Sequence, residues 1–133
     1  MENAAAHYAN LAELWEKSSS AYAQRPLFGV KTAGGWQWLT YADVAAQVDA
    51  CRGALAGQGI EAGGVVAVVA DNRPEWAAAA YASYGRRATY VPMYQAQGLA
   101  EWRFILSDCA AQVVFCATED IYQQLRTLVD DPV

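Results

Sequence analysis

Apolar side chains recur at helical spacing between residues 11 and 22. Asn10 comes directly before this stretch and Glu13 follows three positions later, a spacing typical of an amino-terminal helix cap. Apolar residues then alternate with small or polar ones over residues 27–31 and 36–40, on either side of a glycine-containing turn. This change from helical to alternating spacing predicts a helix followed by a β-hairpin.

Helices and strands alternate through the rest of the sequence. Thr40 and Asp43 have the spacing of a capping box, and they open a helical pattern that stops at Gly57. Residues 65–70 are an unbroken run of valine and alanine, which is typical of a strand buried on both faces. Residues 112–116 are predicted to be another buried strand, and residues 89–93 a short strand with Pro92 near its end. Helices are predicted over 76–84, over 99–106 and after Thr118, which caps the last of them. The sequence therefore predicts an α/β fold with a parallel sheet covered by helices.

Polar residues follow two of the predicted strands. Asp71 and Asn72 come after the strand 65–70, and the loop Tyr94–Gly98 comes after the next strand. Ligands of open α/β sheets bind at this carboxyl edge, so the loop is a candidate wall of a ligand channel. The structural alternatives are equally simple. Asp71 and Asn72 can cap the next helix, with Pro74 in its first turn, and the loop can be an ordinary connection.

Composition and charge exclude several classes of protein. Hydrophobic residues make up 55% of the 133 residues and charged residues 17%, which excludes a disordered chain. The net charge of −5 argues against nucleic-acid binding, and the tryptophans are expected to serve packing. No apolar run approaches the roughly 20 residues of a membrane span, and no secretory signal is visible. The cysteines Cys51, Cys109 and Cys116 are irregularly spaced, which predicts reduced, buried thiols in a cytoplasmic protein.

Candidate chemistry is sparse. His7 is the only histidine, so no histidine-based triad or metal cluster is expected. The glycines at 57 and 59 follow a helix and precede a strand, the reverse of a dinucleotide-binding loop. Arg86 and Arg87 could contact a phosphate, but they are better explained as cations that offset the dipole at a helix end. The sequence therefore predicts no catalytic, cofactor-binding or metal-binding residue in this chain.

Several short segments occur in an order that is itself informative. They are Leu39–Ala45, Gly63–Val68, Asp71–Trp76 with its Asn-Arg-Pro-Glu-Trp sequence, Tyr90–Gln97 and Trp102–Asp108. In this order they resemble the opening of the AMP-forming acyl-CoA synthetases, specifically the long-chain fatty acid CoA ligases, over roughly residues 10–128. The resemblance implies that residues 1–133 are a single partial domain, the amino-terminal portion of such an enzyme's large domain. Arg86 and Arg87 depart from the small residues usual there, which favours a surface role for them.

The resemblance also defines what this stretch lacks. The family's phosphate loop, its aromatic-Gly-x-Thr-Glu segment, its ribose-binding aspartate and its distal lysine have no counterpart here. The parent is expected to use ATP, Mg²⁺ and CoA to make acyl-CoA, AMP and pyrophosphate from a fatty acid, whereas this portion alone is expected to bind no cofactor and to be inactive. The expected partners are the rest of the parent chain and, in some relatives, a second copy. A stand-alone α/β binding or interaction module is the alternative, and a small nucleotide-binding regulator is disfavoured because the phosphate loop is missing.

Overall fold

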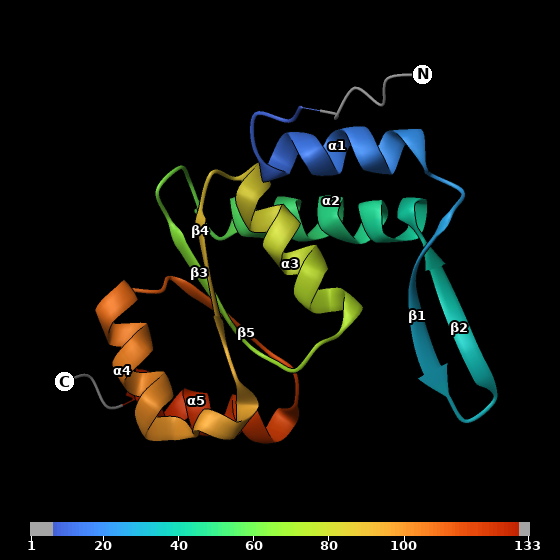
Figure 1. The fold of residues 1–133 in the computed structure, drawn as a ribbon. Helices are drawn as coiled ribbons and strands as arrows, with labels where there is room; N and C mark the ends of the chain where they lie inside the picture. Colours follow the sequence, from blue (N-terminus) through green and yellow to red (C-terminus); the bar gives the residue numbers. More distant parts are fainter. Residues whose placement is uncertain (1–6, 131–133) are drawn as a thin grey trace.

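The structure, a computed structural model, describes residues 7–130 and confirms the alternation of elements (Figure 1). Their order is α1 (Leu11–Ala21), β1 (Pro26–Thr32), β2 (Gly35–Thr40), α2 (Tyr41–Gly57), β3 (Val65–Val69), α3 (Pro74–Gly85), β4 (Thr89–Met93), the short 3-10 helix η1 (Gln95–Gln97), α4 (Leu99–Cys109), β5 (Val113–Cys116) and α5 (Glu119–Asp130). The turn η1 replaces what the sequence predicts as a plain loop. Among the described residues, no helix is both long enough and apolar enough to cross a membrane.

The sheet of the main body has three parallel strands in the order β4-β3-β5. The central strand is β3, which explains its unbroken apolar sequence, because both of its faces and both of its edges are covered. Pro92 lies in the edge strand β4, where a missing N–H donor is tolerated. Residues 112–116 were expected to be buried, but all four residues of β5 are only half-buried. Strand β5 is also an edge strand, so it has one neighbour among the described residues.

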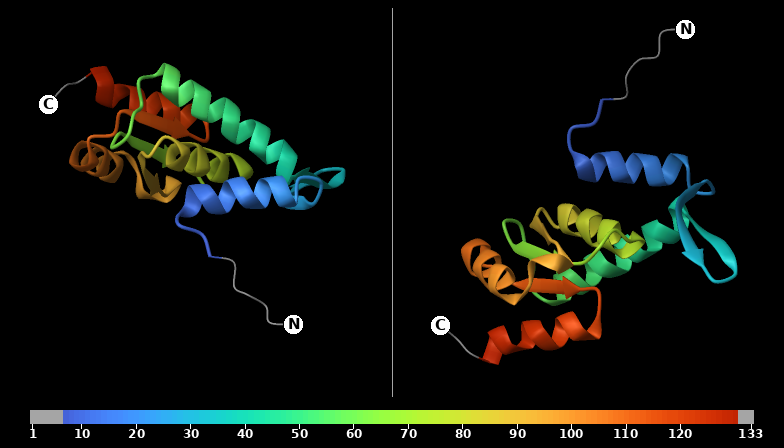
Figure 2. Two further views of the ribbon diagram at one scale, coloured as in Figure 1. Left: turned by 90° about the horizontal axis from the view of Figure 1, so that it is seen from above. Right: turned by 60° about the horizontal axis from the view of Figure 1, so that its bottom comes forward.

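Helices cover both faces of this sheet (Figure 2). One hydrophobic cluster joins α2 and α3 to one face of β3, and its buried members include Val44, Val48, Leu55, Val66 and Ala82. The other cluster joins α4 and α5 to the opposite face, and its buried members are Ala67, Val69, Met93, Trp102, Ile121 and Leu125. Successive residues of β3 therefore enter different clusters, as the alternating geometry of a strand requires.

The hairpin of β1 and β2 projects away from the sheet (Figure 1). Its base is attached to α2 without a loop, because Thr40 is both the last residue of β2 and the N-cap of the helix. The Thr40 hydroxyl accepts from the Asp43 amide at 3.1 Å, and the Asp43 carboxylate accepts from the Thr40 amide at 2.8 Å. The amide of Tyr41 also donates to the carbonyl of Arg25. The predicted capping box is confirmed.

Two of the other predicted caps are confirmed and one is wrong. Asn10 accepts from the amide of Glu13 at 2.9 Å, and Thr118 accepts from the amide of Ile121 at 3.3 Å. Asn72 caps nothing, because Pro74 occupies the first position of α3 and makes Arg73 the N-cap. A residue before proline is held in an extended conformation, which suits an N-cap position, but arginine has no side-chain acceptor with which to cap.

Candidate functional site

The loop after β3, residues 70–73, and the first two residues of α3 border three neighbouring hollows. They have volumes of about 430, 410 and 330 Å³ and share residues of this loop as lining. The loop leaves the carboxyl end of the central strand, which is the edge where parallel α/β sheets bind ligands. The structure therefore places three hollows, together named the cleft here, at the edge that the sequence indicates.

The first hollow is mainly apolar. It lies between α2, α3 and the ends of β3 and β5, and its lining includes Ala79 and Phe115. The thiols of Cys51 and Cys116 also line it, and burial raises the pKa of each thiol. All three cysteines are free, as predicted, but they are half-buried rather than fully buried. Because a raised pKa leaves less thiolate at neutral pH, these two thiols are poorly suited to act as nucleophiles.

The second hollow lies between the loop and the hairpin. Val30, Gln37 and Leu39 line it from β1 and β2, and Asp71 to Glu75 line it from the opposite side. Because paired residues of an antiparallel hairpin share a face, Val30 and Gln37 belong to one side of the hairpin. That side is a wall of the cleft.

The third hollow joins the two polar segments that the sequence singles out. The Gln95 side chain donates from Nε2 to Oδ1 of Asp71 at 3.0 Å, which connects η1 to the loop after β3. Trp102 supports the same segment, because its Nε1 donates to the carbonyl of Tyr94 at 2.9 Å. Tyr94 itself is 77% exposed. The loop Tyr94–Gly98 is therefore held against Asp71 and presents an aromatic ring to solvent.

Sequence reasoning missed the role of Arg73. Its Nε donates to a carboxylate oxygen of Glu75 at 2.9 Å, and its Nη1 donates to the carbonyl of Ala117 at 3.3 Å. The hydrogen bond from Arg73 lowers the pKa of the Glu75 carboxyl. One guanidinium thus connects the start of α3 to the loop after β5. The signal in the sequence is the Arg-Pro-Glu order, since proline fixes the helix start between the two charged residues.

The remaining candidates do not enter the cleft. Arg86 donates from Nε and Nη2 to the carbonyl of Ile60 at 2.9 and 2.7 Å, so it fixes the turn before β3. The Arg86 side chain therefore does not bind its own helix end, although the Arg86 amide donates to the carbonyls of Ala82 and Ser83 there. Arg86 is half-buried rather than at the surface. Arg87 is exposed and has a left-handed backbone with φ of 57°. His7 is exposed before α1 and lines none of the three hollows.

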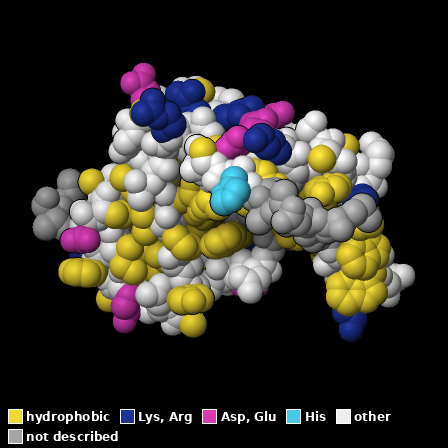
Figure 3. Space-filling model, turned by 45° about the horizontal axis from the view of Figure 1, so that its top comes forward, with side chains coloured by type: hydrophobic (Ala, Val, Ile, Leu, Met, Phe, Trp, Pro, Cys, Tyr) yellow, Lys and Arg dark blue, Asp and Glu magenta, His cyan; other side chains and the backbone are white. Residues whose placement is uncertain are grey.

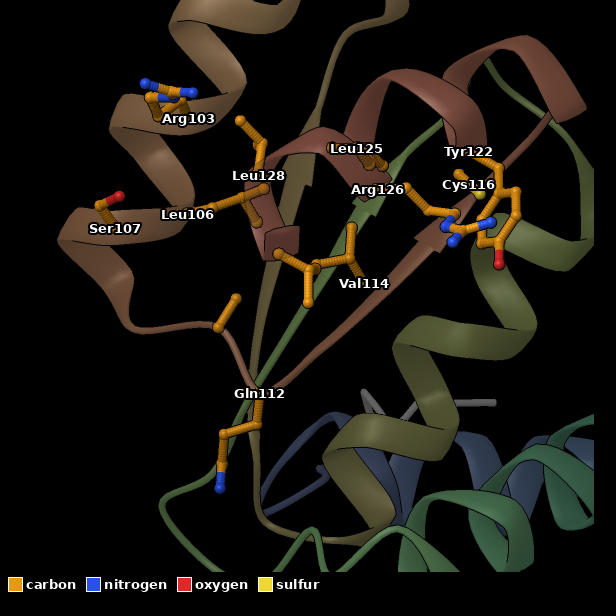
Figure 4. A pocket seen from close by; sticks show the side chains of 12 residues that line it. Arg103, Leu106, Ser107, Gln112, Val114, Cys116, Tyr122, Leu125, Arg126 and Leu128 are labelled. Atoms are coloured by element: carbon orange, nitrogen blue, oxygen red, sulfur yellow. The ribbon is translucent and has the colours of Figure 1, made fainter. Parts of the chain in front are cut away.

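A fourth hollow of about 520 Å³ lies over β5, between α4 and α5. Its apolar floor includes Leu106 and Val114, and its two arginines, Arg103 and Arg126, point away from each other (Figure 4). The guanidinium of Arg126 lies 6.0 Å from the ring of Tyr122. Ser107, Gln112 and Tyr122 also line it, but these polar side chains lie on different sides of the hollow and do not converge to fix a ligand (Figure 4).

The acidic side chains beside the cleft are engaged by neighbouring groups, and no metal-binding cluster forms among the described residues. No group of three or more His, Cys, Asp or Glu side chains could hold a metal ion within residues 7–130. The carboxylates nearest the cleft, Asp71 and Glu75, are engaged by Gln95 and Arg73. The fold and the site thus define an α/β domain whose described residues line hollows at the carboxyl edge of its parallel sheet.

The profile of the family described as AMP-binding enzyme matches residues 15–132, and the chain belongs to this family. A peroxisomal long-chain acyl-CoA synthetase of Arabidopsis thaliana is 30% identical over 76% of this chain and 14% of its own length. An L-proline–[L-prolyl-carrier protein] ligase of Streptomyces coelicolor is 33% identical over 74% of this chain and 18% of its own length. A fatty acyl-CoA synthetase of Mycobacterium tuberculosis shares the fold, with a TM-score of 0.80 and 24% identity over 92% of this chain and 24% of that one. The chain thus spans less than a fifth of the length of these two curated relatives.

Proposed function

We propose that this chain is the amino-terminal portion of an ATP-dependent long-chain fatty acid CoA ligase. The observation that carries the proposal is the family match over residues 15–132, joined with hollows at the carboxyl edge of the sheet. In the proposed parent reaction, a fatty acid and ATP give an acyl-adenylate and pyrophosphate, and CoA then displaces AMP. Residues 1–133 are proposed to form one partial domain of that enzyme.

The described residues do not fit Mg²⁺ and ATP. They contain no cluster that could hold the metal, and the arginine next to the cleft, Arg73, already binds Glu75 and Ala117. Arg86 is committed to the carbonyl of Ile60. Charge stabilisation for adenylate formation is therefore proposed to come from other parts of the parent enzyme. The proposed contribution of this chain is to form part of the wall around the substrates.

The long-chain specificity rests on the relatives and on the Asn-Arg-Pro-Glu-Trp segment. The Arabidopsis relative carries a long-chain name, whereas the Streptomyces relative is named for proline. An apolar hollow lined by alanine, valine and phenylalanine side chains favours an alkyl chain over a polar amino acid. We therefore retain a fatty acid as the proposed substrate of the parent.

Two experiments test this proposal. The 133-residue chain, incubated with palmitate, ATP and Mg²⁺, should give no pyrophosphate exchange above the protein-free rate. A chimera in which residues 15–132 replace the matching segment of the M. tuberculosis fatty acyl-CoA synthetase should form palmitoyl-CoA. Robust exchange by the chain alone would refute the claim that catalysis lies elsewhere. A folded chimera that activates proline but no fatty acid would refute the substrate.

The stand-alone binding module remains the second candidate, and the observation in its favour is that helices of this chain cover the central strand β3. Both faces of β3 are covered by helices of this chain. No buried side-chain nitrogen or oxygen among the described residues lacks a hydrogen-bond partner. If the reading frame of the gene ended after Val133, the module would be favoured over the ligase.

We also propose that the chain acts in the cytoplasm. Its proposed partner is the remainder of the parent enzyme, whose proposed substrates are fatty acid and CoA. The free thiols support a reducing compartment. A relative named as peroxisomal makes that organelle the competing compartment. Fractionation of cells that express the tagged parent enzyme distinguishes the two compartments.

A homodimer of the parent enzyme is proposed as well, and sedimentation velocity of that enzyme tests it.

A further inference from the structure

Two tryptophans lie side by side on the hairpin and are largely exposed. The ring centroids of Trp36 and Trp38 are 6.2 Å apart with an angle of 28° between the planes. Their exposed fractions are 62% and 60%, whereas Trp15 and Trp102 are buried in the two core clusters. Large aromatic side chains gain most when water is excluded from them, so a stacked pair left in solvent is a candidate contact surface.

A glycine on the neighbouring strand gives the two rings their position. Gly29 pairs with Trp38, and a Cβ atom at Gly29 would lie 3.0 Å from the Trp38 ring and 3.2 Å from the Trp36 ring. The missing side chain lets both indoles lie against the backbone of β1. The pair is therefore held in place in the free protein, which lowers the entropic cost of binding.

The tryptophans face away from the cleft. Register places Trp36, Trp38, Gly29 and Lys31 on one face of the hairpin, and it places Val30 and Gln37 on the other. The second face lines the cleft, as described above. The face of Trp36, Trp38 and Lys31, named here the tryptophan face, is thus distinct from the proposed substrate wall.

Charge distinguishes this region from the rest of the chain. No aspartate or glutamate occurs between Glu16 and Asp43, although the whole chain has a net charge of −5. Lys31 pairs with Trp36 near the free end of the hairpin. In the space-filling view, hydrophobic side chains cover the projecting hairpin and a cation lies at its end (Figure 3). The tryptophan face therefore combines indole rings with positive charge and has no carboxylate of its own.

We propose that the tryptophan face docks on the surface of an anionic phospholipid membrane. Indole rings are favoured at the level of the lipid headgroups, where the ring is partly buried and its N–H finds acceptors. Lys31 would lie among the phosphates, where a basic residue near an anionic leaflet gains attraction. The projecting hairpin lets the rings reach a flat surface before the acidic body does. This inference is independent of the proposed ligase reaction.

A second copy of the chain fits this face less well. In a two-fold contact the same face meets itself, so two Lys31 side chains would approach each other. Neither hairpin has a carboxylate with which to pair them. Charge complementarity therefore favours an anionic partner over another copy of the chain.

Vesicle flotation of the full 133-residue chain tests the proposal. The chain should float with phosphatidylcholine vesicles that contain a quarter phosphatidylserine, and less with phosphatidylcholine alone or in 0.5 M salt. In the double variant Trp36→Ala/Trp38→Ala, the bound fraction should fall by about tenfold, because two interfacial anchors are lost. Lys31→Glu should lower the vesicle-bound fraction by about fivefold and make vesicle binding less dependent on salt. Phe104→Ala on α4 is the matched control, because Phe104 is 72% exposed and lies outside the hairpin, and it should bind normally.

Circular dichroism and thermal melting establish that each variant is folded. No flotation of the unmodified chain would overturn the proposal, as would undiminished flotation of the double variant or equal loss in Phe104→Ala. Self-association that disappears in the double variant, without vesicle binding, would assign the face to a second copy. Flotation of the chimera with the M. tuberculosis synthetase, described above, tests whether other parts of a complete enzyme cover the tryptophan face. Flotation of the chain but not of the folded chimera would overturn the proposal for the enzyme.

Discussion

The guanidinium of Arg73 donates to the carbonyl of Ala117 at 3.3 Å, although the two residues follow different strands. Arg73 lies in the loop after β3 and Ala117 in the loop after β5. The strand order β4-β3-β5 reverses between these two strands, and ligands of open α/β sheets bind in the crevice at such a reversal. In this chain an arginine bridges that crevice, and the hollows lie around the bridge.

Replacing Arg73 by alanine should loosen the loop after β5. The free energy of unfolding should fall by about 0.5–1 kcal/mol, because the lost contacts are partly exposed to solvent. The amide of Ala117, which donates to the carbonyl of Val69 at 3.1 Å, should exchange faster with deuterium. Arg73→Lys should behave similarly, since one ammonium cannot reproduce the fork that reaches Glu75 and Ala117 together. Unchanged exchange at Ala117 in a folded variant would contradict the bridging role.

Replacing Trp102 by phenylalanine should release the Tyr94–Gly98 segment while keeping most of the apolar packing of α4. The variant loses the donor to the carbonyl of Tyr94, which should cost about 1 kcal/mol in a urea titration. Proteolysis at this segment should accelerate more than proteolysis elsewhere. Phe104→Leu, an exposed aromatic change on the same helix, is the control and should leave both measurements unchanged.

Acid should weaken the joint between the hairpin and α2. Hydrogen bonds from the amide and hydroxyl of Thr40 lower the pKa of the Asp43 carboxyl from its ordinary value of 3.8. A carboxyl whose pKa is lower in the folded state stabilises the fold above its unfolded pKa, and this contribution is lost as the pH falls through the folded pKa. The melting temperatures of the unsubstituted 133-residue chain and of Asp43→Asn should therefore converge as the pH falls from 6 to 2.5. A constant difference across this range would exclude the carboxylate as the cause.

Cys51 and Cys116 should react slowly with iodoacetamide. Burial raises the pKa of both thiols, so the reactive thiolate is scarcer at pH 7.5 than in a free thiol. Peptide mass spectrometry should show that both thiols are alkylated about tenfold more slowly than glutathione. After unfolding in urea, they should react as fast as glutathione. Rates equal to glutathione in the folded protein would mean that the apolar hollow is open at both thiols.

The regular part of the fold is predictable from local patterns. The capping box at Thr40 and Asp43 is visible as two residues at fixed spacing, and the buried strand β3 as an unbroken apolar run. These features depend on neighbours in sequence, so no knowledge of the distant packing is needed. The edge position of β5 depends instead on strand order, and this explains why residues 112–116 are less buried than predicted.

The site was only partly predictable for a similar reason. The sequence points to Asp71 and to the loop Tyr94–Gly98, because both follow parallel strands, and the structure joins them through Gln95. Long side chains are less constrained by local sequence. Arg73 and Arg86 each reach a carbonyl far away in sequence, at Ala117 and Ile60, and neither partner could be identified before the chain was folded.

The shared position of Thr40 has a mechanical consequence for the cleft. Because β2 ends at the residue that caps α2, no flexible linker separates the hairpin from a helix of 17 residues. Rotation of the hairpin would break the first turn of that helix as well as the pairing at its own base. We therefore expect the hairpin to act as a fixed wall rather than as a lid, and the gap between Val30 and the loop after β3 to keep its width whether the cleft is filled or empty.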